Sequence, residues 1–350
     1  MNKLNILFNT SPGSFGSWGG GEIQLLETKR ELEKIGHQVK ILEEENYNVD
    51  LSKFDVFHNF NIHRVNLEFV LQAKKAGLPV AVSTIYWPSL KSILKWDRGV
   101  KVKAKNIAAE LARTLRVPKL NKAREIIKKA DVLLPNSKAE AKILEKQFGV
   151  DKNKIQVVPN GVDKRFAGAK PGLFEKKFGL KNFILYVGRI EERKNVLSLV
   201  KAMNGVDITL VVIGKAKQGS ECYLRKCKKA AGCNVKFLDP IPHESKLLES
   251  AYAACKVFCL PSWYETPGLA ALEAGLAGAN IVVTQEGCAK EYFEKFASYI
   301  NPGSVEDIRT KILEEFKKDR PKGLSGHIAK NFLWKNAAEK TAEAYKKILG

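Results

Sequence analysis

The amino-acid sequence predicts an α/β protein made of two Rossmann-like halves, with two parallel sheets facing each other across a cleft. The 350 residues exceed what a single hydrophobic core usually organises. Short β-like runs alternate with helical patterns along the whole chain, which is typical of parallel sheets with crossover helices. Residues 159–182 are rich in proline and glycine and are typical of a linker between two such series.

The first half opens with an apolar strand over 4–9, followed by a helix over 21–35 in which apolar residues recur near helical spacing. Gly36 ends this helix, because glycine readily adopts the left-handed conformation after a last turn. The other strands expected in this half are 38–42, 54–58, 79–84, 131–134 and 155–158.

The second half repeats the alternation, and a final helix is expected over 334–349. The strands expected here are 183–187, 207–213, 235–238, 256–260 and 280–283. We therefore expect an N-terminal Rossmann-like domain over 1–160 and a C-terminal one over 161–333. Ligands of such sheets bind at the carboxyl ends of the strands, so functional residues are expected there.

The composition is that of an ordinary globular protein, with 45% hydrophobic and 28% charged residues. The run Leu4–Asn9 predicts a short strand and not a secretory segment. No run approaches the about 18 apolar residues of a membrane-spanning helix, so a cytoplasmic protein is expected. The six cysteines form no C-x-x-C pair and have no histidine cluster beside them. They predict neither a zinc site nor a disulfide scaffold.

The formal net charge is +21, and much of the excess in the first half is concentrated in one segment. Residues 89–129 hold 13 basic and 3 acidic residues, interleaved with apolar ones such as Val102 and Leu111. Such a segment suits an anionic membrane surface, an anionic acceptor or nucleic acid. Only Trp96 is present for base stacking and no nucleic-acid-binding module matches, so nucleic acid is not expected. A solvated lysine-rich face is the alternative.

A glycine-rich loop, Gly19-Gly20-Gly21-Glu22, follows the first strand and opens the first helix. Glycines let a bulky ligand approach the backbone, and the free amides of a helix N-terminus attract phosphate. The spacing matches neither the dinucleotide-binding fingerprint nor the P-loop. Gly20 and Gly21 are candidate phosphate-binding residues, with a plain flexible turn as the alternative.

Two cations follow the first strand of the second half. That strand ends at Gly188, so Arg189 is expected at its carboxyl end, and Lys194 at the start of the next helix. Together they would neutralise a leaving diphosphate as its charge develops. The alternative is a pair of surface cations beside Glu191 and Glu192.

Two glutamates bracket the start of another helix. Pro267 suits the first helical position, which places Glu265 just before the helix and Glu273 about two turns into it. Eight helical residues rise by ~12 Å, close to the length of a nucleoside diphosphate sugar. One carboxylate would then accept hydrogen bonds from hydroxyls of the sugar, and the other from hydroxyls of the ribose. The backbone amides of Gly268 and Leu269 would contact the diphosphate. The alternative is a cap and a solvent-facing residue.

These segments, in this order, resemble retaining glycosyltransferase family 4, the group 1 glycosyltransferases, whose fold is GT-B. The matching segments are Gly19–Glu22 with Gly36–Val39, Val158–Asp163, Val187–Arg189 with Lys194, and Glu265 with Glu273. The resemblance implies that the final helix, 334–350, packs back on the N-terminal domain.

The resemblance also implies the roles of the candidate residues. Arg189 and Lys194 would bind the diphosphate of a nucleotide-sugar donor, Glu265 the transferred sugar, and Glu273 the ribose. The candidate catalytic residues are Arg189, Lys194 and Glu265, and the donor site also includes Gly20, Gly21, Gly268, Leu269 and Glu273.

The chain departs from the family on the acceptor side. Tyr86 stands where many members carry a histidine, and of a frequent His-x-His pattern only His58 is present. A phenol forms hydrogen bonds but carries no positive charge at neutral pH. Tyr86 and His58 are candidate acceptor-side residues, and His58 as a core histidine is the alternative.

The reaction implied is a retaining, front-face hexosyl transfer to an acceptor hydroxyl, in which the leaving phosphate helps to deprotonate the acceptor. The chain has no Asp-x-Asp metal motif, so we expect neither a metal nor a cofactor beyond the donor substrate. An anionic or lipid-linked acceptor would place the protein peripherally on the inner face of the membrane. The alternatives are a nucleotide-sugar epimerase of the same fold and a non-catalytic nucleotide-sugar-binding protein.

Overall fold

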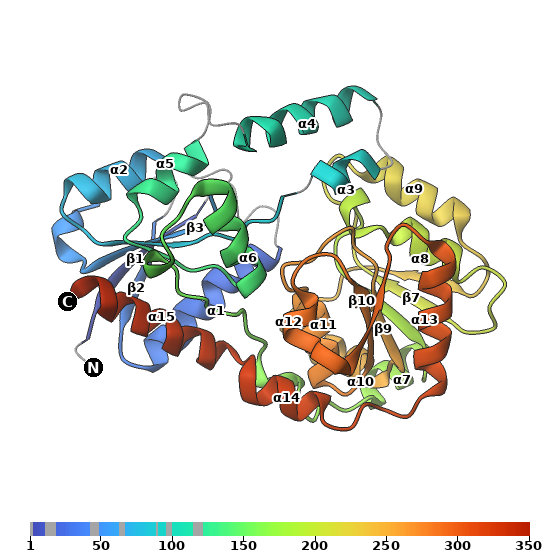
Figure 1. Ribbon diagram of the computed structural model, residues 1–350. Helices are drawn as coiled ribbons and strands as arrows, with labels where there is room; N and C mark the ends of the chain where they lie inside the picture. Colours follow the sequence, from blue (N-terminus) through green and yellow to red (C-terminus); the bar gives the residue numbers. More distant parts are fainter. Residues whose placement is uncertain are drawn as a thin grey trace. The chain divides into compact units, whose positions relative to one another are not determined.

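The structure of the protein is a computed structural model that describes residues 3–10, 19–42, 49–62, 67–88, 90–95, 100–114 and 122–350. The chain forms two compact units (Figure 1). Unit 1 contains residues 1–88, 105–161 and 334–350, and unit 2 contains residues 89–104 and 162–333.

Unit 1 is built on a five-stranded parallel sheet with the strand order β2-β1-β3-β4-β5. Its strands are β1 (Asn5–Asn9), β2 (Gln38–Ile41), β3 (Val56–Phe60), β4 (Val80–Ser83) and β5 (Val132–Leu133). The three central strands are buried almost throughout, because helices cover both faces of a parallel sheet. At the carboxyl ends of β1 and β3, Asn9 Nδ2 donates a hydrogen bond to Asn59 Oδ1 at 2.7 Å.

The helices of unit 1 pack in pairs, α15 against α1 and α2 against α5. They are α1 (Gly20–Lys34), α2 (Leu67–Lys75), α5 (Lys122–Lys129), α6 (Lys138–Ile143) and α15 (Trp334–Leu349). Figure 1 shows α15, at the C-terminus, lying along α1. The two ends of the chain sequence therefore share one unit.

The strand expected over 155–158 does not form. Ile155 makes a single bridge to Leu133, and two further backbone hydrogen bonds run from Gln156 to Leu133 and from Val158 to Pro135. β5 is only two residues long, and Pro135 has no N–H to donate back. The ladder therefore stops after one bridge.

Unit 2 is built on a six-stranded parallel sheet with the order β11-β10-β9-β6-β7-β8. Its strands are β6 (Ile184–Val187), β7 (Leu210–Ile213), β8 (Val235–Leu238), β9 (Val257–Leu260), β10 (Asn280–Thr284) and β11 (Ala297–Ile300). The edge strand β11 was not expected from the sequence, because its half-buried residues form no apolar run. The prediction of two parallel-sheet α/β halves is confirmed.

Nine longer helices belong wholly or partly to unit 2 among the described residues. They are α3 (Leu90–Lys95), α4 (Val100–Thr114, shared with unit 1), α7 (Gly172–Phe178), α8 (Val196–Ala202), α9 (Glu221–Ala230), α10 (Lys246–Ala254), α11 (Leu269–Leu276), α13 (Val305–Lys317) and α14 (Leu324–Asn331), and the short α12 (Ala289–Phe293) precedes β11. Within the described ranges, no helix is both long and apolar enough to cross a membrane. The six cysteines are all free thiols.

Candidate functional site

The sheet of unit 2 has a topological switch point between β6 and β9, where the chain reverses its direction of progress across the sheet. Ligands of open parallel sheets bind outside the carboxyl ends of the strands at such a point. β6 ends at Val187 and leads to Arg189, and β9 ends at Leu260 and leads to Glu265. These two predicted site residues follow the two strands that flank the switch point.

Two glycines let the segments after β6 and β7 approach each other. A Cβ on Gly214 would lie 2.0 Å from the carbonyl oxygen of Gly188, and Gly214 has a φ of +155°. Beyond this contact, Ile190 and Ala216 form a bridge. Lys217, which follows β7, therefore lies beside the segment that follows β6.

Four cations and two carboxylates gather at this switch point, and every one is in contact with another. They are Arg189, Arg193, Lys194 and Lys217 with Glu191 and Glu265. Four positive and two negative formal charges leave an excess of +2 at neutral pH. The arrangement therefore attracts an anion.

The buried carboxylate of Glu265 is paired directly with Lys194. Lys194 Nζ donates to Glu265 Oε1 at 2.6 Å, and the hydroxyl of Ser262 donates to the same oxygen. The side chains of Lys194 and Glu265 are 15% and 6% exposed. Burial raises the pKa of Glu265, but Lys194 and Arg193 together lower it by more. The net pKa therefore lies below the ordinary value. Glu265 is therefore an ionised hydrogen-bond acceptor at neutral pH.

Glu191 holds three of the cations. Its Oε1 lies 3.5 Å from Arg189 Nη2 and 3.5 Å from Arg193 Nη2, and its Oε2 lies 3.2 Å from Lys217 Nζ. Burial raises its pKa, but these cations outweigh burial and lower the pKa to about 2. Glu191 therefore holds these three cations close to a single carboxylate.

Arg193 contacts both carboxylates of the cluster, Glu191 and Glu265. Its Nη1 donates to the backbone oxygen of Tyr264 at 3.2 Å and lies 3.9 Å from Glu265 Oε1. Its guanidinium lies 5.3 Å from the centroid of the Tyr264 ring, and its own carbonyl accepts from Trp263 N at 2.9 Å. The segment that carries Glu265 is therefore fixed to the segment that carries Lys194.

The helix after Glu265 begins two residues later than the sequence predicts. α11 starts at Leu269, and Gly268 caps it in the left-handed conformation with φ +89° and no side-chain hydrogen bond. L side chains rarely adopt this positive φ, which is the reason for a glycine at this cap. Pro267 is consequently outside the helix, and Glu273 lies only about 6 Å of helix rise beyond Leu269.

Glu273 faces two hydrogen-bond donors. Its Oε1 is 2.8 Å from His243 Nε2, and its Oε2 accepts from the Tyr252 hydroxyl at 2.7 Å. His243 lies in the connection between β8 and α10, and Tyr252 lies on α10. The carboxylate is buried and has a fixed direction.

Gly20 and Gly21 lie in unit 1, where they form the first residues of α1. Gly19 is the N-cap and provides no side-chain hydrogen bond. A Cβ on Gly21 would meet only Ile85 Cδ1, at 3.9 Å. The backbone is therefore open to a ligand here, and the two glycines belong to a different unit from the cation cluster.

His58 is a fully buried residue of β3. Its Nδ1 lies 2.6 Å from the hydroxyl of Tyr345 on α15, and its Nε2 lies 3.0 Å from Ser83 Oγ. Burial lowers its pKa to about 3, so the ring is neutral. Both ring nitrogens are occupied by side chains of the core, which is the environment of a core histidine.

Tyr86 also lies in the hydrophobic core of unit 1. Its ring packs edge-on against Phe148 at 5.4 Å, and its backbone N–H donates to Glu140 Oε1 at 2.7 Å. Neither acceptor-side candidate is at the surface of its unit.

Several residues beside the three carboxylates were not predicted from the sequence. They are Arg193 and Ser262 beside Glu265, Lys217 beside Glu191, and His243 and Tyr252 beside Glu273. Arg193 adjoins Lys194 and could have been included for that reason. Ser262 lies in the same short segment as Glu265. Lys217, His243 and Tyr252 come from other segments of the chain, and the fold brings them to these carboxylates.

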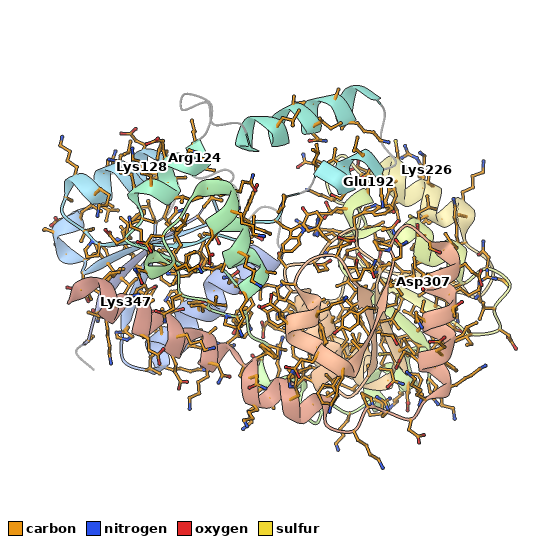
Figure 2. The ribbon with its side chains drawn as sticks, in the orientation of Figure 1. Arg124, Lys128, Glu192, Lys226, Asp307 and Lys347 are labelled. Carbon is orange, nitrogen blue, oxygen red and sulfur yellow. The ribbon has the colours of Figure 1, made fainter. Side chains whose placement is uncertain are left out.

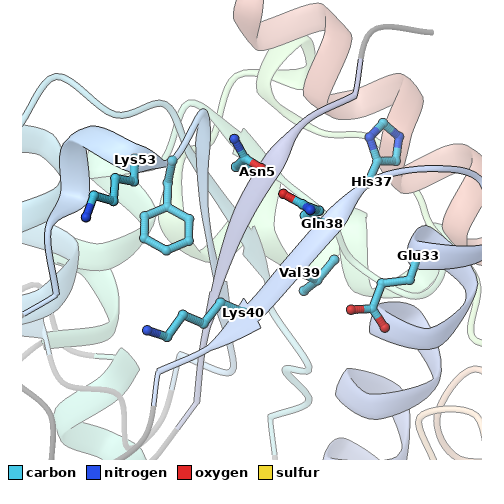
Figure 3. A pocket seen from close by; sticks show the side chains of 8 residues that line it. Asn5, Glu33, His37, Gln38, Val39, Lys40 and Lys53 are labelled. Atoms are coloured by element: carbon cyan, nitrogen blue, oxygen red, sulfur yellow. The ribbon is translucent and has the colours of Figure 1, made fainter.

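A hollow of about 620 Å³ lies elsewhere, in unit 1 (Figure 3). Asn5 and Gln38, the first residues of β1 and β2, line it together with His37 and Lys53. It therefore opens toward the amino ends of these strands, opposite the edge where parallel sheets bind ligands. We do not place the functional site there.

Two family models match the chain. The model described as "Glycosyl transferases group 1" matches residues 174–331, and the model described as "Glycosyltransferase Family 4" matches residues 49–166. The first covers the switch-point cluster and Glu273.

Curated proteins with related sequences include two named glycosyltransferases. A D-inositol 3-phosphate glycosyltransferase of Pseudarthrobacter chlorophenolicus is 29% identical over 46% of this chain and 41% of its own. An O-antigen chain mannosyltransferase B of Escherichia coli is 26% identical over 50% of this chain and 49% of its own. The chain thus spans about half the length of these relatives.

Solved structures share the fold over nearly the full chain. Sucrose-phosphate synthase from Thermosynechococcus elongatus has a TM-score of 0.78 at 16% identity and covers 99% of each chain. HepE from Anabaena, in complex with UDP-glucose, has a TM-score of 0.70 at 16% identity and covers 98% of this chain and 100% of its own. With the GT-B fold and the two matching family models, the chain belongs to the group 1, family 4 glycosyltransferases.

Proposed function

We propose that the protein transfers a hexosyl unit from a nucleoside-diphosphate sugar to an acceptor hydroxyl, with retention of configuration and without a metal ion. The observation that carries this proposal is the cluster of four cations and two carboxylates at the switch point of unit 2. Its excess of +2 matches the formal charge of about −2 on the diphosphate of a sugar nucleotide.

The roles of the residues follow from their contacts. Arg189 and Lys194 bind the diphosphate and stabilise the charge that develops as it leaves. Glu265, kept ionised by Lys194, accepts hydrogen bonds from hydroxyls of the transferred sugar. Glu273 accepts hydrogen bonds from the hydroxyls of the ribose. The N-terminus of α11, at Gly268 and Leu269, faces the diphosphate.

In the transfer step, the bond between the anomeric carbon and the donor phosphate oxygen breaks. The acceptor oxygen bonds to the same face of that carbon, and the acceptor proton passes to the leaving phosphate oxygen. The products are a glycoside and a nucleoside diphosphate. The UDP-glucose complex of HepE, which shares the fold, supports a donor of this class.

The experiment is a thermal-shift screen against UDP-, GDP- and ADP-sugars, followed by a transfer assay with the sugar nucleotide that stabilises most. A ligand of the native state raises the melting temperature. Arg189→Ala should abolish most of the shift, whereas Lys229→Ala, an exposed cation of α9, should leave it unchanged. No shift with any sugar nucleotide would refute the proposal.

Incubation of the donor without an acceptor separates the alternatives. A nucleotide-sugar epimerase of this fold would convert the donor sugar into its epimer, and a non-catalytic nucleotide-sugar-binding protein would leave it unchanged in every mixture. A glycosyltransferase releases nucleoside diphosphate in step with glycoside formation, and only when the acceptor is present.

We propose further that segment 89–129 faces an anionic membrane and presents a lipid-linked or otherwise anionic acceptor. In the described part of this segment, Leu94, Val102 and Leu111 are exposed. One relative is a D-inositol 3-phosphate glycosyltransferase, and a phosphate named in this way is anionic, which supports this class of acceptor. A cytoplasmic protein held on the inner face of the membrane would result.

The cations of this segment divide into two kinds on α5, where Figure 2 labels Arg124 and Lys128. Arg124 donates to the backbone oxygens of Gln147 and Phe148, at 3.1 and 3.3 Å, so it stabilises unit 1. Lys128 is exposed. Basic side chains near an anionic surface contribute ~1 kcal/mol each, and salt weakens them.

Co-sedimentation with vesicles tests the membrane proposal. A variant with Lys105, Lys122 and Lys128 changed to glutamate should lose binding to vesicles of phosphatidylserine and phosphatidylcholine while keeping its donor thermal shift. A matched variant changes three exposed lysines of unit 2, Lys181, Lys229 and Lys236, by the same charge. Equal loss in both variants, or equal binding to neutral vesicles, would refute the role of the segment.

A further inference from the structure

The carboxylate of Glu273 is held by two donors of different kinds. The Tyr252 hydroxyl, 2.7 Å from Oε2, is fully buried, and its pKa is raised well above the ordinary value, by burial first, so it stays protonated. His243 Nε2 lies 2.8 Å from Oε1, and the His243 side chain is 27% exposed. Only the histidine can change its charge near neutral pH.

The second ring nitrogen of His243 has two possible partners with opposite requirements. Nδ1 lies 3.2 Å from Arg165 Nη2 and 3.2 Å from Glu244 Oε1. A neutral ring with its proton on Nε2 accepts from Arg165, and a protonated ring donates to Glu244. The hydrogen bond from Nε2 to Glu273 is the same in both states.

The charged groups around this ring are mostly acidic. On α11 and α10, Glu273 contacts the ring, while Glu249 lies 3.8 Å from Arg165 Nε. The charged and titratable groups of the surrounding elements are Asp163 and Arg165 of the segment at η6 (Lys164–Phe166), Glu244 of the loop, Lys246, Glu249 and Tyr252 of α10, and Glu273 of α11. Burial lowers the pKa of His243, but the hydrogen bond and charge of Glu273 raise it, so the net pKa lies above 6.5.

We propose that His243 is a positioning residue for donor binding, which directs the Glu273 carboxylate to the ribose and makes donor affinity depend on pH through its own charge. This inference rests on the proposed function. A carboxylate offers about four lone-pair sites, so two remain for the ribose hydroxyls after His243 and Tyr252 are satisfied.

The sign of the pH dependence follows from the charges. At acidic to neutral pH the imidazolium of His243 and the carboxylate of Glu273 form a pair with no net charge. Once His243 loses its proton, the pair carries one negative charge beside an anionic donor. Donor affinity therefore falls as the pH rises through the pKa of His243, above 6.5.

Isothermal titration calorimetry with a sugar nucleotide tests this dependence. The probe is UDP-glucose, or the GDP- or ADP-sugar that gives the largest thermal shift, because a diphosphate diester does not titrate in this range. We expect the Kd of the wild type, divided by that of His243→Gln, to rise about 3- to 10-fold from about pH 6 to 8. Glutamine retains a donor to Glu273 but does not titrate.

Tyr252→Phe is the matched control. It removes one hydrogen bond to the same carboxylate and should raise the Kd equally at every pH. His243→Ala should reduce the preference for the ribose donor over its 2′-deoxyribose analogue by about 5-fold, because Glu273 loses its direction.

The outcomes separate the two proposals. Should no sugar nucleotide bind the wild type, the proposed function fails, and the inference falls with it. Should the nucleotide bind with the same pH profile in wild type and His243→Gln, or should His243→Ala keep the full ribose preference, the inference fails while the proposed function stands.

Discussion

Replacing Lys194 by alanine removes the cation closest to the buried carboxylate of Glu265. Replacing Arg189 by alanine removes one of the three cations that surround the carboxylate of Glu191. Lys194 is 2.6 Å from Glu265, whose other cation, Arg193, lies 3.9 Å away. Glu191, the partner of Arg189, keeps Arg193 and Lys217 at 3.5 and 3.2 Å. The two variants should therefore differ in stability although both lose activity.

The magnitudes follow from burial. Breaking a buried ion pair costs about 3–5 kcal/mol, and we expect about 3 kcal/mol for Lys194→Ala because Arg193 remains near Glu265. Arg189 is 30% exposed, so its ion pair is screened and its loss should cost less than about 1 kcal/mol. For the transfer reaction, each variant should lose about 10²–10³-fold in kcat, since each removes a group that stabilises the leaving diphosphate.

Thermal unfolding as a function of pH separates these effects. In the wild type the pKa of Glu265 is lowered, so the ion pair of Glu265 stabilises the folded state fully above about pH 4.5. This stabilisation is lost as the pH falls through the lowered pKa. In Lys194→Ala we expect burial, the largest influence on the Glu265 pKa, to outweigh Arg193 and to raise this pKa. The stability gap between wild type and variant should therefore narrow as the pH falls from about 7 to about 5.

Two results would refute this reasoning. Equal melting temperatures for Lys194→Ala and Arg189→Ala would show that the pair with Glu265 does not stabilise unit 2. Near-normal turnover of both variants at saturating donor would show that neither cation acts on the leaving group.

Three further outcomes are expected. Transfer should persist in excess EDTA, and abolished activity that magnesium or manganese restores would contradict a metal-free reaction. Gly214→Ala should lower the free energy of unfolding by more than about 3 kcal/mol in denaturant titrations, because its Cβ would lie 2.0 Å from the Gly188 oxygen; a stable variant would contradict this close approach. His58 is neutral when folded, with a pKa of about 3, so the wild type should lose about 2 kcal/mol relative to His58→Asn between about pH 6.5 and 5, measured by urea unfolding. Parallel pH profiles would show that the histidine is not buried.

The sequence by itself determined the alternating strands and helices, whereas most of the expected linker over 159–182 belongs to unit 2, where α7 packs against α10. Apolar runs of four or five residues form strands when both sheet faces are covered, so their positions are readable from the pattern alone. Arg189 and Glu265 could be placed at strand ends for the same reason. The edge strand β11 has no such pattern, because its half-buried residues depend on a neighbouring strand that is already in place.

The tertiary structure decided which side chains meet. Lys194 and Glu265 are 71 residues apart, and His243 and Glu273 are 30 apart, so their pairing depends on the strand order of the unit 2 sheet. It also decided the environment of His58, which Tyr345 of α15 and Ser83 of β4 enclose together. The local sequence pattern indicates which face of a helix or strand is buried and where the element ends. The distances between the ends of different strands depend on the strand order, which non-local packing selects.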